Sequence, residues 1–427
     1  MKKKIASALI LFVFSLGLVL GALSPTALAV DDEPELDGVI RAAMTVNLES
    51  GQTTYELDAD KELFPGPTVK LMCAVVAYER LSERLDETVT FTDDMVYGGG
   101  FFLRGDSVPI VDIFESLLIR GTNDAAAALA TLACGSDKAM VEAMNEKAAE
   151  LGMSSTTYAN VYGLHSASAK TTVRDTMRLA ECFYNIRPLC EMASAPSATI
   201  SLSGEETTIY NRSAFASTYY NTKYRRTDVE SYLSGSTAES GACLVCGGRE
   251  NGLTYITVVM GALADEKSEP NVYTAAGELV DYSYDNFGYV KVLDEGRVFD
   301  ELPVELSHVS DHVTVCSEDS LSIFCKNGTN TDLRVTFEHT LDLESLTAPI
   351  KAGERVGTLT VRFDGETIAE LGLYTANSLP KSSLLEFFDT AGAILGNPIV
   401  IILLSLSALA LLATPFISAI RASHYEE

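Results

Sequence analysis

The sequence predicts a mixed α/β (α+β) domain, a small all-β domain after it, and a C-terminal transmembrane helix. Helical and strand-like patterns alternate as far as residue 291. Beyond it, short alternating strands follow one another, as at Leu359, Val361 and Phe363. Residues 399–420 contain no charged side chain and are long enough to cross a bilayer. We therefore expect a signal peptide at 1–29, domains at 30–291 and 292–375, a juxtamembrane linker at 376–398, the transmembrane helix at 399–420 and a tail at 421–427.

The N-terminus has the pattern of a secretory signal. Three lysines at positions 2–4 precede an apolar run, and Ala27-Leu28-Ala29 supplies the small residues of a cleavage site. Without these residues the chain has 28 basic and 59 acidic side chains, a net charge of −31. Nucleic acid and anionic lipid headgroups need a positive surface, so both are poor partners for this chain, and no nucleic acid is expected to bind. We expect a single-pass protein of the cell membrane whose bulk is extracytoplasmic; a buried soluble helix at 399–420 is the alternative.

Cysteine and histidine spacing predicts no metal site and no cofactor. Cys243 and Cys246 lie in a strand-like stretch, where residues three apart face opposite sides of the strand. This arrangement opposes both a disulfide between them and the binding of one metal ion by both. Cys316 and Cys325 could pair across a hairpin, and a disulfide there is left open. The five histidines are scattered singly.

The first domain should begin with a hairpin and then alternate helices with loops. Met44, Val46 and Leu48 alternate with polar residues before a Glu-Ser-Gly turn. In chain order we expect a hairpin at 42–57, helices from 67 to 79, 111 to 120, 125 to 134, 138 to 151 and 172 to 184, strands and loops over 200–232, strands at 242–247 and 253–262, and a closing helix at 271–287. The Gly-rich stretch 93–105 should be a loop. In the second domain Asp364-Gly365 predicts a hairpin turn, and the apolar residues of 384–388 predict an amphipathic juxtamembrane segment.

One lysine stands out chemically. Lys70 lies at the start of an almost wholly apolar helix, where serine acyl-transfer enzymes place a lysine one turn after their nucleophile. The residue three positions before it is Pro67, which carries no nucleophile.

The order of these segments resembles the D-alanyl-D-alanine carboxypeptidases, the low-molecular-weight penicillin-binding proteins of serine peptidase family S11. The segments FPGPTVKLM (64–72), LIRGTNDAA (118–126) and LSGST (233–237) followed by GACLV (241–245) are similar to the flanks of the family's S-x-x-K, S-x-N and K-T-G motifs. YGLH (162–165) and TTVRD (171–175) also match a family segment. The resemblance spans about residues 38–375. It implies the penicillin-binding-protein/β-lactamase-like transpeptidase fold and action on peptidoglycan stem peptides through an acyl-serine.

The same resemblance places losses at all three motifs. Pro67 stands at the nucleophile, Gly121 at the second serine, and Leu233 at the lysine that would hold the substrate carboxylate. Replacing that ammonium by an alkyl chain removes a charge-assisted hydrogen bond worth about 1.5–3 kcal/mol. The rest of the degenerate K-T-G region, Ser234, Gly235 and Thr237, is expected to line the substrate site.

Lys70 and Asn123 are the retained motif positions. By resemblance they act as a base and as a polar contact to the hydroxyl and substrate; the alternative is that Lys70 only pairs with a nearby acid or with Asn123. Thr68 is a conceivable substitute nucleophile, although one residue along a helix turns the side chain about 100° away from Pro67.

Three functions remain open from the sequence. The first is a membrane-anchored homologue that no longer catalyses and binds peptidoglycan or a cell-wall enzyme. The second is a divergent but active carboxypeptidase, with Thr68 as a possible nucleophile. In the third, the first domain is a spacer that presents the β domain to partners.

Overall fold

The structure is a computed structural model that describes residues 33–98, 100–263 and 271–423. The expected signal peptide and the last residues of the expected tail lie outside these ranges. The described chain forms two compact units that divide between Asn286 and Phe287. This division lies five residues before the domain boundary expected from the sequence.

The first unit contains nine strands and seven helices among the described residues. Its strands are β1 (Ala42–Asn47), β2 (Thr53–Leu57), β3 (Thr88–Thr90), β4 (Ser107–Pro109), β5 (Ser197–Leu202), β6 (Glu205–Tyr210), β7 (Val229–Thr237), β8 (Gly241–Glu250) and β9 (Leu253–Ala262). Its helices are α2 (Val69–Leu81), α3 (Ile110–Glu115), α4 (Asn123–Cys134), α5 (Asp137–Glu150), α6 (Val173–Tyr184), α7 (Arg187–Ser194) and α8 (Asn271–Asn286). Short turns of 3-10 helix occur at η1 (Gly66–Thr68), η2 (Ser82–Arg84), η3 (Asp93–Met95) and η5 (Thr222–Tyr224), and η4 (Ser116–Arg120) is a π-helical turn.

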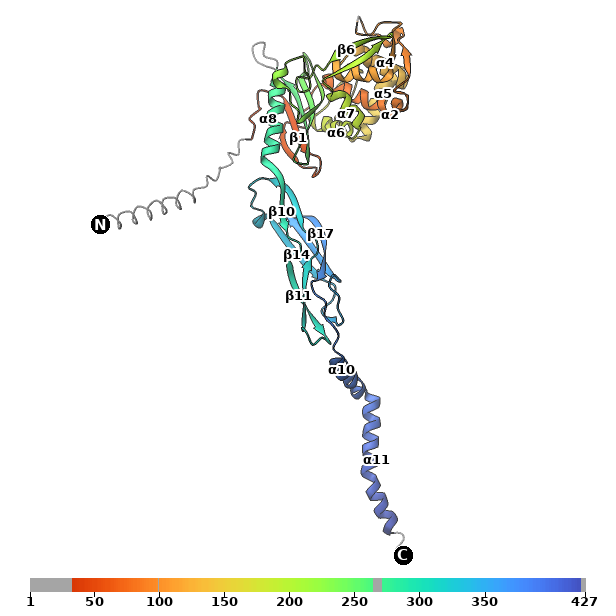
Figure 1. Cartoon of the computed structure of the whole chain (residues 1–427), viewed down its shortest axis with the longest axis vertical. Helices are drawn as coiled ribbons and strands as arrows, with labels where there is room; N and C mark the ends of the chain where they lie inside the picture. The colour runs from red at the N-terminus through yellow and green to blue at the C-terminus, as the bar shows by residue number, and fades with distance from the viewer. Residues whose placement is uncertain (1–32, 99, 264–270, 424–427) are drawn as a thin grey trace, which may run out of the picture. The chain divides into compact units, whose positions relative to one another are not determined.

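An antiparallel five-stranded sheet in the order β2-β1-β9-β8-β7 forms the frame of this unit. Nine of the ten residues of β9 are buried, which requires cover on both faces of the sheet. Figure 1 shows α8 on one side of the sheet and the remaining helices on the other. On the α8 side, the buried Thr54 hydroxyl lies 2.8 Å from that of Ser283. The predicted mixed α/β fold is confirmed.

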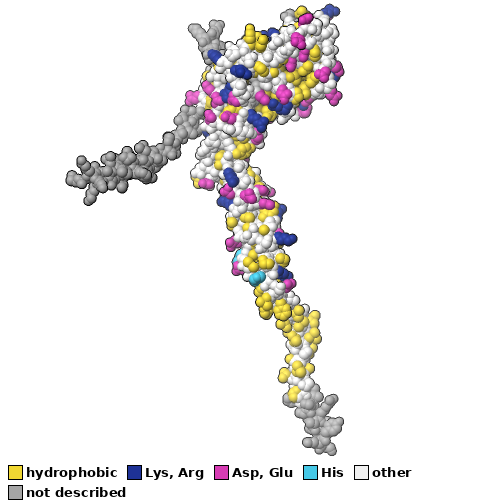
Figure 2. Space-filling model, viewed as in Figure 1, with side chains coloured by type: hydrophobic (Ala, Val, Ile, Leu, Met, Phe, Trp, Pro, Cys, Tyr) yellow, Lys and Arg dark blue, Asp and Glu magenta, His cyan; other side chains and the backbone are white. Residues whose placement is uncertain are grey.

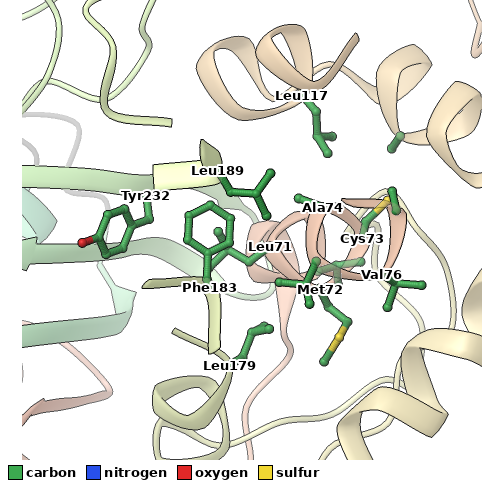
Figure 3. Packing of buried hydrophobic residues seen from close by; sticks show 14 of the residues in the cluster. Leu71, Met72, Cys73, Ala74, Val76, Leu117, Leu179, Phe183, Leu189 and Tyr232 are labelled. Carbon is green, nitrogen blue, oxygen red and sulfur yellow. The ribbon is translucent and has the colours of Figure 1, made fainter. Parts of the chain in front are cut away.

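Helix α2 is the centre of the larger core. All residues from Val69 to Ala77 are buried, so the helix has no solvent-facing side over two turns. Its side chains share one buried cluster with Leu117 from the π-helical turn, Leu179 and Phe183 from α6, and Leu189 from α7 (Figure 3). The apolar run that follows Lys70 therefore predicted a buried helix correctly.

Two local features differ from the sequence analysis. The expected helix at 111–120 is interrupted: α3 ends at Glu115 and continues as a π-helical turn to Arg120. No element was expected at α7, which is only eight residues long but buries Leu189, Cys190 and Ala193. Such a short segment gives little periodic signal, and its burial comes from contacts that are distant in sequence.

The second unit begins with β strands. These are β10 (Phe287–Leu293), β11 (Val298–Glu305), β12 (His312–Ser317), β13 (Leu321–Lys326), β14 (Val335–Leu341), β15 (Leu346–Thr347), β16 (Arg355–Phe363) and β17 (Glu366–Thr375), with the short helix α9 (Thr331–Arg334) before β14. Six of them form a sheet in the order β14-β16-β17-β12-β11-β15, and β10 pairs with β13. The predicted hairpin is present: Asp364 and Gly365 have φ of 52° and 85°, as a type I′ turn requires.

Cys316 and Cys325 do not face each other across a hairpin. Their strands β12 and β13 are consecutive, but β12 pairs with β11 and β17 whereas β13 pairs with β10. Both thiols are free. The hairpin expectation was wrong because it relied on proximity in sequence, and these neighbours in sequence belong to different sheets.

Two helices, α10 (Ser383–Gly396) and α11 (Pro398–Ser423), end the described chain. The Ser382 hydroxyl caps α10 by accepting from the Leu385 amide, as Ser does at an N-cap. Within α11, residues 398–415 are long and apolar enough to cross a membrane, and none of them is buried against protein. Figure 2 shows hydrophobic side chains along this part of the chain. The predicted apolar C-terminal helix is confirmed as a structural element.

Shortening a side chain in the centre of α2 should destabilise the first unit. Leu71 is fully buried, so Leu71→Ala removes apolar contacts and leaves a cavity, which should lower the free energy of unfolding by about 2–5 kcal/mol. Leu103→Ala is the control, because Leu103 is 59% exposed and should change stability by less than about 0.5 kcal/mol. Chemical denaturation of the full chain in detergent micelles measures both; equal losses would contradict the central role of α2.

Candidate functional site

A cavity of about 410 Å³ lies in the first unit, at the N-terminal end of α2. It brings together all the site residues selected from the sequence. These are Pro67, Lys70, Gly121, Asn123, Leu233, Ser234, Gly235 and Thr237. They come from three segments that are up to 170 positions apart, so only the fold makes them neighbours.

Six backbone segments line this cleft. The 3-10 turn η1 and the first turn of α2 supply Pro67 and Lys70, and strand β7 lies next to them. The π-helical turn with the start of α4, the loop at 162–164, the end of α7 and residues 211–213 complete the lining. A π-helical turn is frequent at functional sites, and here it ends at Gly121, which closes the turn in a left-handed conformation.

The loop at 162–164 approaches the start of α2 more closely than a side chain would permit. Gly163 has a φ of 78°, and a Cβ atom there would lie 2.1 Å from the carbonyl oxygen of Gly66. The Asn160 side chain holds the loop in place by accepting from the amides of Tyr162, Gly163 and Leu164. Only glycine fits at position 163.

Lys70 is nearly buried, with 8% exposure, and points to this loop. Its Nζ donates a 2.7 Å hydrogen bond to the backbone carbonyl oxygen of Tyr162, and no carboxylate among the described residues pairs with it. Burial lowers the pKa of Lys70 from 10.5 to about 8, an effect that the nearby thiol of Cys73 partly opposes. Among the described residues, Lys70 thus pairs neither with an acid nor with Asn123, which was the alternative considered from the sequence.

Pro67 forms the floor of the cleft next to β7. A Cβ atom at Gly235 would lie 2.9 Å from the Cβ of Pro67, so the strand backbone lies against the proline ring. Proline also fits the backbone here, because the first turn of a helix needs no N–H donor. The ring offers no hydroxyl, amine or ionisable group to the cleft.

Thr68 is turned away from the cleft. Its hydroxyl is buried, donates a 2.8 Å hydrogen bond to the Pro65 carbonyl and does not line the cavity. A nucleophile needs access to the substrate and a base within hydrogen-bond reach, and this hydroxyl has neither in the described geometry.

Gly121 and Asn123 line the cleft from the end of the π-helical turn and the start of α4. Gly121 has a φ of 70°, and open space surrounds the position where a Cβ would be. Asn123 is the first residue of α4 and is partly exposed; none of the described residues hydrogen-bonds its side-chain amide. Close by, the buried hydroxyl of Ser116 lies 2.9 Å from that of Thr122 and ties the π-helical turn to α4.

Strand β7 carries the remaining predicted site residues. Leu233 is partly buried and places an alkyl side chain on the cleft wall. The Ser234 hydroxyl lies 2.5 Å from the hydroxyl of Tyr273 in α8, and the Thr237 hydroxyl lies 2.8 Å from that of Ser240. These hydroxyls thus already have partners within the protein.

The cleft also contains two cations that the sequence analysis missed, Arg120 and Arg212. The Arg120 guanidinium lies 4.5 Å from the centroid of the Phe101 ring, and Arg212 is exposed. With Lys70 they give the described lining three basic side chains and no acidic one, although the chain carries 59 acids. A positive cleft in an acidic protein favours an anionic ligand. The signal available in the sequence was the absence of Asp and Glu from residues 210–227.

Among the residues that the structure describes, no group of three His, Cys, Asp or Glu side chains could hold a metal ion. The described lining of the cleft supplies cations, hydroxyls and backbone amides. These can bind and orient a carboxylate, but Pro67 occupies the place where the resemblance requires a nucleophile.

Removing the buried amine should change how stability depends on pH. An unfolded lysine keeps its proton up to about pH 10.5, whereas folded Lys70 loses it above about pH 8. Between these values the unfolded state binds more protons at this group, so the contribution of Lys70 to stability should rise with pH, by at most about 3 kcal/mol. The free energy of unfolding of the wild-type chain minus that of Lys70→Met should therefore increase between pH 7.5 and pH 10, whereas the same difference for the exposed control Lys170→Met should stay constant. Denaturation of the full chain at both pH values measures these differences; a constant difference for Lys70→Met would contradict the burial of a titrating amine.

Family models and individual relatives point to the same protein family. The family model for D-alanyl-D-alanine carboxypeptidase, peptidase S11, matches residues 31–264, and the model for the C-terminal domain of penicillin-binding protein 5 matches residues 287–381. The chain is 26% identical to D-alanyl-D-alanine carboxypeptidase DacC of Escherichia coli over 84% of this chain and 89% of that protein. It is 21% identical to DacF of Bacillus subtilis over 87% and 95%.

Solved structures agree in fold. The D-alanyl-D-alanine carboxypeptidase DacD of Francisella tularensis superposes with a TM-score of 0.59 at 18% identity, over 85% of this chain and 98% of that one. Penicillin-binding protein 6B of Escherichia coli gives a TM-score of 0.58 at 21% identity, over 80% and 96%. The match of the peptidase S11 model to more than half of the sequence, on this fold, shows that the chain belongs to the D-alanyl-D-alanine carboxypeptidase family.

Proposed function

We propose that this protein is a membrane-anchored member of its family that does not form an acyl-enzyme and instead binds peptidoglycan stem peptides through the retained cleft. The observation that carries the proposal is the combination at one site of an open cavity of about 410 Å³ and a proline at the family's nucleophile position. A collapsed cavity would have favoured a structural relic. A cell-wall enzyme that presents an anionic segment is the alternative occupant.

The losses act on separate steps of the family's reaction. Pro67 removes the atom that would carry the acyl group, Gly121 removes a hydroxyl beside it, and Leu233 removes a cation from β7. The burial and hydrogen bond of Thr68 speak against the divergent-enzyme hypothesis, because no other motif position supplies an accessible hydroxyl next to Lys70.

Binding has support from what remains in the cleft. Arg120 and Arg212 are basic, and they line the same cavity as Lys70. A stem peptide ends in a carboxylate, and a guanidinium can hold a carboxylate with two parallel hydrogen bonds. The two arginines thus supply positive charge to the cavity in which Leu233 stands in place of the family's lysine.

The membrane anchor is part of the same proposal. Residues 398–415 are uncharged and none of them is buried against protein, as a span in contact with lipid requires. The expected signal at 1–29 would export the first unit and the β domain and leave the C-terminal tail in the cytoplasm. The cleft would then face the compartment that contains the cell wall.

A penicillin should not label this protein covalently. With Pro67 in place of the serine, a fluorescent penicillin has no hydroxyl to acylate, and the intact mass of the full chain should stay unchanged after incubation. An active family member labelled in parallel is the positive control. A mass increase equal to one penicillin that persists after denaturation would overturn the proposed loss of chemistry.

A pentapeptide that ends in a free carboxylate should bind reversibly, and Arg212 should contribute to its affinity. Loss of a charge-assisted hydrogen bond in Arg212→Gln should weaken binding by about tenfold or more in isothermal titration calorimetry. Arg225→Gln is the matched control, because Arg225 is exposed in the same loop but does not line the cleft. Equal affinities for both variants would rule out the carboxylate contact.

A further inference from the structure

The segment 210–227, which leads from β6 to β7, differs in composition from the rest of the chain. It contains four tyrosines, four basic residues and no Asp or Glu, in a protein with 59 acidic and 31 basic side chains. Asn211, Arg212 and Ser213 of this segment line the cleft. Tyr210 directly precedes them at the end of β6.

Three of the tyrosines form an exposed corner, which we call the tyrosine corner: Tyr210, Tyr219 and Tyr220. The rings of Tyr210 and Tyr219 stack with centroids 4.8 Å apart and planes at 21°, and Tyr220 meets Tyr219 nearly at a right angle, 84°, with centroids 4.9 Å apart. Their exposed fractions are 38%, 65% and 44%. Adjoining aromatic rings that stay exposed to water are typical of an interaction surface.

The backbone holds this corner in place before any ligand binds. Ser217 is fully buried, and its hydroxyl accepts hydrogen bonds from the amides of both Tyr219, at 3.1 Å, and Tyr220, at 2.8 Å. Below the turn, the buried ring of Phe215 packs on Tyr273 of α8. A rigid aromatic surface loses little conformational freedom on binding, which favours affinity.

The chemistry of this surface fits a sugar. An aromatic face is the negative part of a quadrupole and attracts weakly positive C–H groups. A pyranose ring presents such C–H groups on a flat face of similar size, and its hydroxyls reach past the ring edge to polar neighbours. We propose that the tyrosine corner binds a sugar ring of the peptidoglycan strand whose stem peptide enters the cleft. This inference rests on the proposed function and adds a carbohydrate subsite to it.

The order of residues in the segment agrees with the order of groups in such a ligand. Tyr210 of the corner is bonded directly to Asn211, which lines the cleft, so a sugar on the corner would hold its attached peptide close to the cleft lining. Arg212 follows in the same lining and can pair with a carboxylate of that peptide. A peptide alone would leave the corner empty and gain nothing from it.

Calorimetry with three probes separates the corner from the cleft: a stem pentapeptide, the same pentapeptide on an N-acetylglucosaminyl-N-acetylmuramyl disaccharide, and the disaccharide alone. With the full chain in detergent micelles, the disaccharide pentapeptide should bind more tightly than the pentapeptide, by up to about tenfold, the upper end of the scale for one aromatic ring contact. Tyr219→Ala should abolish this difference and leave the affinity for the pentapeptide unchanged. Tyr219→Phe keeps the ring and should keep the difference.

The matched control is Tyr289→Ala, which removes a tyrosine with 49% exposure from the second unit and should change no affinity. Equal affinities for the two peptide probes would overturn the sugar subsite and leave the stem-peptide cleft standing. Sugar binding that depends on Tyr219 without pentapeptide binding would support the corner and count against the cleft. Binding of none of the three probes would overturn both and direct attention to a protein partner.

Discussion

The contact between the loop at 162–164 and the start of α2 is the constraint on which the cleft depends. The absence of a side chain at Gly163 lets its backbone meet the Gly66 carbonyl, and the neighbouring Tyr162 carbonyl then receives the buried amine of Lys70. This hydrogen bond gives the amine one partner in a place where burial disfavours its charge. Moving the loop outward would at once uncover Lys70 and remove one wall of the cleft.

The architecture and the composition of the site followed from the sequence to a large extent. The run of apolar residues after Pro67 predicted α2, because an all-round apolar helix must lie in a core. The alternation at Leu359, Val361 and Phe363 predicted β16 in the same way. The site residues selected from the sequence all line one cavity. They could be selected because the sequences that flank each motif are retained, although the catalytic residues of the motifs are altered.

Features set by contacts between distant segments were beyond prediction from the sequence. The partner of Lys70 is a backbone carbonyl 92 positions away, and no residue type signals such an acceptor. Arg212 looked like any solvated cation, and only the course of the chain from β6 to β7 brings it to the cleft. Cys316 and Cys325 show the reverse case, because nearness in sequence suggested a pairing that the sheet order does not allow.

The left-handed backbone at Gly121 limits what single substitutions can do at this site. A serine there would have to adopt a φ of 70°, which costs an L-residue about 1–2 kcal/mol, and it would find no hydroxyl at Pro67 next to it. A serine at position 67 alone would meet an amine that already donates to the Tyr162 carbonyl. The two positions are therefore coupled, and the effect of a hydroxyl at either one depends on the residue at the other.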